Sequence, residues 1–300
     1  MNSKRKQKDI LVIAQDAGGA EMLAAYIRKH FRNYNFHIYA GDPALRIFRR
    51  ERLPSKKLTR MNINRVISAH REDFALLGTG RPVSLELAAL KEIKRHHMMA
   101  AAYIDSWTNY RERFGYPRSG WQRNLPKEIW TGDSSALALA KQYFRTIRIR
   151  FVPNQYFANV VSTYRARTRR LRKTQGILYM SAASRHSGKL LDNFLAECSR
   201  RAISSAVRIR MHPENSRIQY ERIISRHAKG IRAELSREKD IVDDLLHARV
   251  VVGPETNALV LASLCGIRTI RIVPDREKYF LPFKEIIRVK SAKSAVRKIF

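Results

Sequence analysis

The sequence predicts an α/β protein made of two doubly wound, Rossmann-like domains. Short apolar runs typical of buried parallel strands alternate along the whole chain with segments of helical apolar spacing. Several runs end at a glycine beside an acidic or hydroxyl side chain, as strand-to-helix turns do in such folds. A length of 300 residues fits about two domains, and 44% hydrophobic residues suffice for a core in each.

The first half opens with a strand at 10–14, a turn containing Asp16 and Gly18-Gly19, and a helix at 21–31. This order is typical of the start of a doubly wound domain. Residues 54–64 are expected to form a polar connection, and 108–126 a long loop of the kind that is usually functional or mobile. Further strands are expected at 36–40, 74–77, 98–104, 128–132 and 147–152, and helices at 42–52, 83–96 and 134–144.

A change of composition near Pro153 marks the expected boundary, which gives domains at 1–152 and 153–300. Between 145 and 175 the chain has nine lysines or arginines and no acidic residue. In the second half we expect strands at 176–180, 207–211 and 231–235, and helices at 156–164, 189–202, 216–229, 240–247 and 292–300. The acidic residues that open the 240–247 helix, Asp240, Asp243 and Asp244, fit a solvated helix start.

The strongest local pattern of the second half is the segment 249–266. A β-branched run at 250–252 stops at Gly253-Pro254, Glu255 or Thr256 stands where a helix N-cap belongs, and Gly266 fits the residue after the helix. A further strand is expected at 269–273, and this β–loop–α–β unit requires a parallel sheet. The loop therefore offers backbone N–H groups and a positive helix end to a phosphate or carboxylate.

The net charge of +33, from 59 Lys and Arg against 26 Asp and Glu, favours a polyanionic partner. Nucleic acid, an anionic membrane face and an acidic glycan all qualify, and so does a merely solvated basic surface. Nucleic acid is the weaker choice, because no recognised motif is present and aromatics do not alternate with the basic run at 165–173. The chain has only two cysteines and no apolar run long enough to span a membrane, which predicts a cytoplasmic protein. Its positive charge is compatible with peripheral contact at the inner face of a membrane.

Two dipeptides at predicted strand ends carry a family resemblance. His212-Pro213 and Glu255-Thr256 are similar to the HP and Ser/Thr motifs of bacterial sialyl- and Kdo-type transferases, and the order of elements resembles GT-B glycosyltransferases. The segment 76–114 also resembles bacterial proteins of surface-polysaccharide synthesis. The resemblance implies two domains facing a cleft, a nucleotide-sugar donor that could be CMP-linked, a glycan or lipid-linked acceptor, and no further cofactor.

In that interpretation the second domain binds the donor. His212 could donate to a donor phosphate and stabilise the leaving group, a hydroxyl or N–H at Thr256 could bind phosphate, and Glu255 suits a ribose hydroxyl. Each has a structural alternative, namely a histidine before a turn proline, a helix cap, or a polar turn. The predicted donor site comprises Ser181, Ser184, Arg185, His212, Pro213, Glu255 and Thr256.

Glycosyl transfer also needs a base for the acceptor hydroxyl, and Asp16 and Asp105 each follow a predicted strand. Asp16 is narrowly preferred for its place in the first β–α turn, although an N-cap and an Asx-turn are the structural alternatives. The expected acceptor contacts, for which a packed loop is the equal alternative, are Gly18, Gly19, Trp107, Asn109, Tyr110 and Arg111.

Several other classes find no support. The chain lacks GxxxxGK[ST] and GxSxG, its DAGGA segment lacks full GxGxxG spacing, and His96-His97 has no neighbouring ligands at zinc spacing, so no metal site is expected. We therefore expect a metal-independent glycosyltransferase. The alternatives are a nucleotide-sugar epimerase on the same fold and a non-enzymatic polyanion-binding protein.

Overall fold

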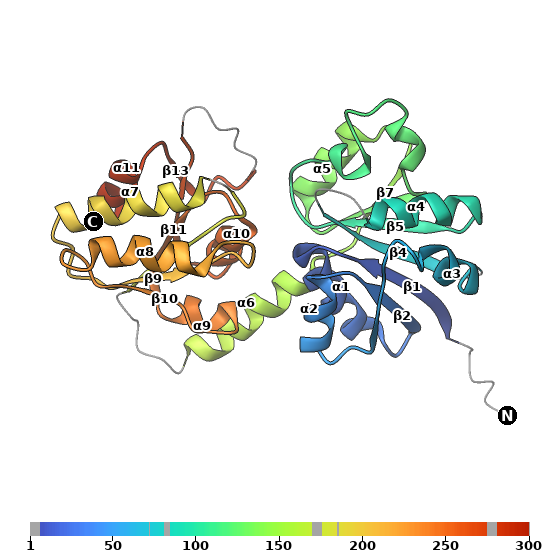
Figure 1. Ribbon diagram of the computed structural model, residues 1–300, viewed down its shortest axis with the longest axis horizontal. Coiled ribbons are helices and arrows are strands. Elements are labelled where there is room, and N and C mark those ends of the chain that lie inside the picture. The colour runs from blue at the N-terminus through green and yellow to red at the C-terminus, as the bar shows by residue number, and fades with distance from the viewer. Residues whose placement is uncertain are drawn as a thin grey trace. The chain divides into compact units, whose positions relative to one another are not determined.

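The computed structural model describes residues 7–71, 73–80, 85–169, 176–184, 186–274 and 281–299. The chain divides into two compact units, Met1–Ala158 and Asn159–Phe300, and each contains one parallel sheet with helices packed against it (Figure 1). The predicted α/β class and doubly wound topology are confirmed. The division of labour between an acceptor and a donor domain stays a prediction.

The sheet of the first unit has seven parallel strands in the order β3-β2-β1-β4-β5-β6-β7. Successive strands add outward on one side of β1 and then, from β4, on the other, so the topological switch point lies between β1 and β4. The strands are β1 Lys8–Ala14, β2 Tyr34–Ala40, β3 Ser55–Lys57, β4 Phe74–Thr79, β5 Ala100–Ile104, β6 Glu128–Thr131 and β7 Arg148–Phe151. The helices are α1 Ala17–His30, α2 Ala44–Arg50, α3 Ile63–Ala69, α4 Leu85–Arg95, η1 Glu112–Phe114, η2 Trp121–Asn124 and α5 Ser134–Tyr143.

Both faces of this sheet are buried, which is why its central strands read as continuous apolar runs. Along β1, Leu11 and Ile13 belong to the core under α3, α4 and α5, whereas Ile10 and Val12 belong to the core under α1 and α2. Alternate side chains of a strand point to opposite faces, so a strand covered on both sides must be apolar at every position.

The segment 54–64, expected to be a polar connection, contains strand β3 and the start of helix α3. The expectation of a connection without secondary structure is wrong, because β3 pairs with β2 at the sheet edge and α3 begins at Ile63. β3 has only three residues, two of them exposed lysines, and α3 contributes only Ile63, Val66 and Ile67 to the core. Elements this short give too few turns or alternations for a periodic signal.

The sheet of the second unit has six parallel strands in the order β10-β9-β8-β11-β12-β13. Its switch point lies between β8 and β11, where a Cβ at Gly253 would stand 2.0 Å from the carbonyl oxygen of Met180. The strands are β8 Gly176–Met180, β9 Val207–Arg210, β10 Ala233–Leu235, β11 Ala248–Gly253, β12 Arg268–Ile272 and β13 Ile287–Val289, which was not expected. The helices are α6 Gln155–Thr168, which begins in the first unit, α7 Ser187–Arg200, α8 Arg217–His227, α9 Ile241–Leu246, α10 Asn257–Leu264 and α11 Ala292–Ile299.

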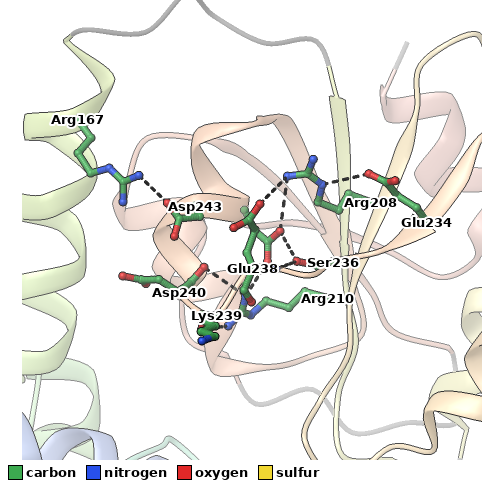
Figure 2. A network of polar contacts seen from close by, with 10 residues as sticks. Arg167, Arg208, Arg210, Glu234, Ser236, Glu238, Lys239, Asp240 and Asp243 are labelled. Atoms are coloured by element: carbon green, nitrogen blue, oxygen red, sulfur yellow. Dashed lines mark hydrogen bonds and ion pairs between the residues drawn. The ribbon is translucent and has the colours of Figure 1, made fainter. Parts of the chain in front are cut away.

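A polar network joins α9 to β9 and to α6 (Figure 2). The side chain of Asp244 has no exposed surface and accepts hydrogen bonds from Arg210 Nη1 and Ser236 Oγ, both at 2.6 Å. Arg167 of α6 pairs with Asp243 at 2.5 Å. The expected solvated helix start is therefore wrong for Asp244, because Arg210 and Ser236 replace the water that this carboxylate gives up.

None of the helices in the described part of the chain is long and apolar enough to cross a membrane.

Candidate functional site

Polar side chains of the first unit gather where three neighbouring strands end. Asp16 follows β1, Gly80 follows β4 and Asp105 follows β5, and β4 lies between the other two strands. Ligands of open parallel sheets bind outside the carboxyl ends of the strands at the switch point, which here is the place of Asp16 and Gly80. The two carboxylates predicted as bases are thus brought to one edge of the sheet.

Asp16 caps helix α1 with one of its two carboxylate oxygens, and the other oxygen takes no part in the cap. Its Oδ1 accepts from the N–H of Gly18 at 2.7 Å and of Gly19 at 3.2 Å. Its Oδ2 is fully covered and has no hydrogen-bond partner among the described residues. Burial, reinforced by the negative charge of Asp105, raises the pKa of Asp16 from 3.8 to about 7. The N-cap alternative is therefore correct for Oδ1 and leaves Oδ2 able to exchange a proton near neutral pH.

Asp105 is held by a buried guanidinium that the sequence analysis did not single out. Arg113 is 4% exposed and its Nη1 donates to Asp105 Oδ1 at 2.7 Å. The same side chain donates to the hydroxyl of Ser106 and to the carbonyl and hydroxyl of Thr79. Its charge offsets that of Asp105, so Asp16 is the carboxyl of this pair that is less well compensated.

The glycines predicted as acceptor contacts make room for these carboxylates. A Cβ at Gly18 would lie 2.0 Å from Asp105 Oδ2, and one at Gly19 would lie 3.0 Å from Asp16 Oδ2. A Cβ at Gly80 would meet the Cβ of Asp16 at 2.4 Å. Glycine is required at Gly18 and Gly80 because the acidic side chains pack directly onto the backbone there.

A third carboxyl, Glu86 of α4, lies beneath this edge. It is 2% exposed, accepts from the N–H of Gln15 at 2.7 Å, and burial raises its pKa. No sequence signal marks Glu86, because it stands among apolar residues of a helix and only the fold turns it toward Asp16. Its negative charge adds to the rise of the Asp16 pKa.

The aromatic loop that follows β5 is packed. Trp107 is 5% exposed and donates from Nε1 to Asp133 at 2.9 Å, while Tyr110 is 1% exposed and donates to the carbonyl of Ala136. Asn109 bonds the hydroxyl of Thr108, and the Arg111 guanidinium lies over the ring of Tyr116 at 4.3 Å. The packed-loop alternative thus describes Trp107 and Tyr110, and stacking of a sugar on either ring would require the loop to open.

In the second unit the predicted donor residues also follow neighbouring strands. His212 comes after β9, Ser181 after β8 and Glu255-Thr256 after β11, and these three strands are consecutive in the sheet. The close approach of Gly253 to Met180 holds the last two loops side by side. Arg185 lies outside the described residues.

His212 is oriented by its own turn. Its Nδ1 accepts from the N–H of Glu214 at 3.3 Å, and burial lowers its pKa below 6.5. A neutral ring that accepts at Nδ1 carries its proton on Nε2, which can donate to an oxygen of a ligand. The exposed Pro213 forms part of the same turn.

Ser181 and Ser184 differ in their surroundings. Ser181 is 4% exposed, and its hydroxyl shares a network with Ser187, Tyr220 and Asn215. These buried hydrogen bonds hold the loop that follows β8 against α7 and α8. Ser184 is exposed and its Oγ accepts from the N–H of His186 at 3.2 Å, so this hydroxyl is the one of the pair that a ligand can reach.

Glu255 and Thr256, the two residues before α10, differ in their contacts. Glu255 forms a buried ion pair with Arg271 at 3.0 Å, and Arg271 also binds the carbonyl of Leu281. Thr256 occupies the N-cap position of α10 but makes no side-chain cap hydrogen bond. Its hydroxyl lies at the positive N-terminal end of α10 and is therefore suited to an anion.

Comparison with known proteins identifies the architecture. A UDP-N-acetylglucosamine 2-epimerase from Rickettsia bellii superposes with a TM-score of 0.72 at 11% identity over 98% of this chain and 87% of that one. The fold is the GT-B fold. The corresponding enzyme from Neisseria meningitidis bound to UDP-GlcNAc gives 0.62 at 9% identity over 88% and 82%, and a glycosyltransferase from Rickettsia africae gives 0.61 at 10% over 98% and 87%.

No family model and no curated protein sequence matches the chain. At identities this low the likeness concerns the fold alone, which confirms the GT-B-like prediction.

Proposed function

We propose that this protein is a nucleotide-sugar-dependent glycosyltransferase that transfers the sugar to a glycan or lipid-linked acceptor of surface-polysaccharide synthesis. The observation that carries the proposal is the carboxyl of Asp16, whose pKa is about 7 and whose Oδ2 has no partner among the described residues. A general base near its working pH is what removal of a hydroxyl proton requires. The two 2-epimerases of similar fold named above are described as acting on or binding UDP-N-acetylglucosamine, which supports a nucleotide-sugar as donor.

The proposed reaction divides between the two units. In the second unit, His212 Nε2–H, the Thr256 hydroxyl and the α10 N–H groups bind the donor phosphates and stabilise the charge that develops as the glycosidic bond breaks. In the first, Asp16 Oδ2 takes the proton of the acceptor hydroxyl as its oxygen bonds to the sugar carbon. Because Gly80 lies against Asp16, the acceptor reaches Oδ2 only when this segment moves aside.

The other proposed properties follow from the charge and the resemblance. The +33 chain supports peripheral contact of a cytoplasmic enzyme with an anionic inner membrane face, where a lipid-linked acceptor would be presented. CMP-linked acidic sugars are the donors that the HP and Ser/Thr motifs favour, and the solved UDP-sugar proteins make UDP the competing nucleotide.

A nucleotide-sugar epimerase is the second candidate, because the TM-score of 0.72 belongs to a UDP-N-acetylglucosamine 2-epimerase. An epimerase also needs a group that moves a proton, so Asp16 fits both reactions. Incubation with UDP-N-acetylglucosamine and no acceptor separates them: interconversion of the free nucleotide sugar supports an epimerase, and its absence together with acceptor-dependent transfer supports the transferase.

The first experiment is calorimetric titration with CMP, CDP, UDP, GDP and ADP at moderate salt, which screens the nonspecific attraction of a basic protein for phosphate. We compare the wild type with His212→Ala and use His247→Ala, an exposed histidine at the end of α9, as the matched control. Selective binding of one nucleotide, weakened at least tenfold only by His212→Ala, is the expected result. Equal weak binding that disappears with salt in all three proteins would refute the donor site.

A further inference from the structure

A second cluster of titratable side chains lies in the first unit, away from the edge that carries Asp16. Asp9 is near the start of β1, Asp73 immediately precedes β4, His37 lies in β2, and His70 caps the end of α3. His37 pairs with Leu11, three residues before the end of β1, and Asp9 lies two residues earlier in that strand, so the cluster lies about 10–16 Å from the carboxyl edge at about 3.3 Å per residue. None of the chemistry proposed above uses these side chains.

We propose that His37, His70 and Asp73 form a binding site for a divalent transition metal ion, with Zn²⁺ as the best fit. Each residue offers one ligand atom, and the three atoms lie within 4.8 Å of one another. Ligands around tetrahedral zinc are about 3.3 Å apart, since zinc bonds nitrogen and oxygen at about 2.0–2.1 Å. Closing the site therefore requires side-chain shifts of no more than about 1.5 Å for any pair.

The contacts within the cluster are those that a zinc site uses. Asp73 Oδ2 lies 2.7 Å from His70 Nδ1, and Asp9 Oδ1 lies 2.9 Å from His37 Nε2. The two imidazole rings approach with centroids 4.6 Å apart, and the Tyr39 hydroxyl lies 3.3 Å from His70 Nε2. Carboxylates and hydroxyls that hydrogen-bond ligating histidines fix their orientation and raise their affinity for metal. Asp9 is placed to do this for His37 or to serve as a fourth ligand.

Two imidazoles select against Mg²⁺ and Ca²⁺, which prefer oxygen ligands, and favour Zn²⁺, Co²⁺ or Ni²⁺. The three ligands come from separate segments of the chain, so a bound ion would cross-link β2, the end of α3 and the turn before β4. The site is partly accessible, with side-chain exposures of 34% for His37, 14% for His70 and 15% for Asp73, so an ion can enter without unfolding. We expect it to stabilise the first unit.

The test is titration of the intact, metal-free protein with Zn²⁺ in competition with a chromophoric chelator. The wild type should bind one tight equivalent, and Co²⁺ at the same site should give the visible absorption bands of tetrahedral coordination. The double variant His37→Ala/His70→Ala should lose the bands and bind Zn²⁺ at least 100-fold more weakly. His247→Ala, which removes a histidine of the second unit, should bind as the wild type does.

Asp73→Asn removes one charged ligand and changes the shape of the side chain least, so it keeps the test decisive if the double variant does not fold. It should weaken Zn²⁺ binding at least tenfold, and Zn²⁺ should raise the melting temperature of the wild type more than that of this variant. Zinc affinity that is unchanged in Asp73→Asn, or absent in the wild type, would mean that the cluster contains only His–Asp hydrogen-bonded pairs and would overturn the proposal.

Discussion

Replacing Asp16 with asparagine should remove activity and stabilise the protein. The folded state holds the pKa of Asp16 at about 7 against 3.8 for a solvated aspartate, because burial and Asp105 oppose its ionisation. The unfolded chain therefore releases this proton first as the pH rises, and stability is lost progressively between the two values. Each unit of difference corresponds to about 1.4 kcal/mol, so the raised pKa of Asp16 lowers the free energy of unfolding by about 1.5 kcal/mol at pH 5 and by about 4 kcal/mol at pH 8.

Asparagine does not titrate and is as good an N-cap as aspartate, so Asp16→Asn keeps the bonds to Gly18 and Gly19 while removing this cost. All three tryptophans, Trp107, Trp121 and Trp130, belong to the first unit, so tryptophan fluorescence during urea denaturation reports on that unit selectively. The stability gain of the variant should grow by about 2–3 kcal/mol between pH 5 and pH 8. Glycosyl transfer should fall by about 10²–10⁴-fold.

Asp42→Asn is the matched control, because Asp42 is an exposed aspartate of the first unit that forms a surface ion pair with Arg46 at 3.5 Å. It should change neither stability nor activity by a measurable amount. A stability difference for Asp16→Asn that does not vary with pH would show that Asp16 is an ordinary solvated cap. Full transfer activity in both Asp16→Asn and Asp105→Asn would refute the assignment of the base to this pair.

Two further substitutions test the packing of the second unit. Asp244→Ala removes the buried carboxylate that Arg210 and Ser236 bind, while the partly exposed Arg210 keeps water and backbone carbonyls as partners. It should destabilise this unit by about 1–3 kcal/mol, measured by thermal unfolding monitored with tyrosine near-UV circular dichroism. Gly253→Ala places a methyl group 2.0 Å from the carbonyl oxygen of Met180 and should separate β8 from β11, so that nucleotide binding in calorimetry falls at least tenfold. Unchanged unfolding in the first variant, or unchanged binding in the second, would contradict these contacts.

The features that the sequence predicts well are those with local causes. The predicted unit at 249–266 is present as β11 and α10, with Gly266 at a φ of +77°. A β-branched run favours the strand, Gly253-Pro254 ends it, and a glycine in the left-handed region ends the helix, so each signal is local. The position of the predicted donor residues at one edge of the sheet also follows from sequence, since residues after parallel strands meet there, whereas the order of the three strands comes from the structure.

The features that the sequence does not predict depend on contacts between distant segments. Arg113 reaches Thr79 across 34 positions, and nothing in the loop at 108–126 separates it from the other basic residues of a chain with 59. The zinc ligands His37 and His70 lie too far apart in sequence for any spacing rule. For Trp107 and Tyr110 the sequence leaves acceptor contact and a packed loop as equal alternatives, because the hydrogen bonds to Asp133 and Ala136 join segments 26 positions apart.

The charges at the two strand edges support the proposed assignment of donor and acceptor. Among the residues that the structure describes, the first unit places Asp16, Asp105 and Glu86 near the guanidinium of Arg113, so three carboxyl groups share its one positive charge. A nucleotide diphosphate brought there would meet like charge at low dielectric. The second unit presents a histidine and a hydroxyl at a helix N-terminus. Of the carboxylates in those loops, Glu255 is neutralised by Arg271 and Glu214 is exposed to solvent. These charges support our proposal that the second unit binds the phosphates and that the first binds the neutral hydroxyl that must lose a proton.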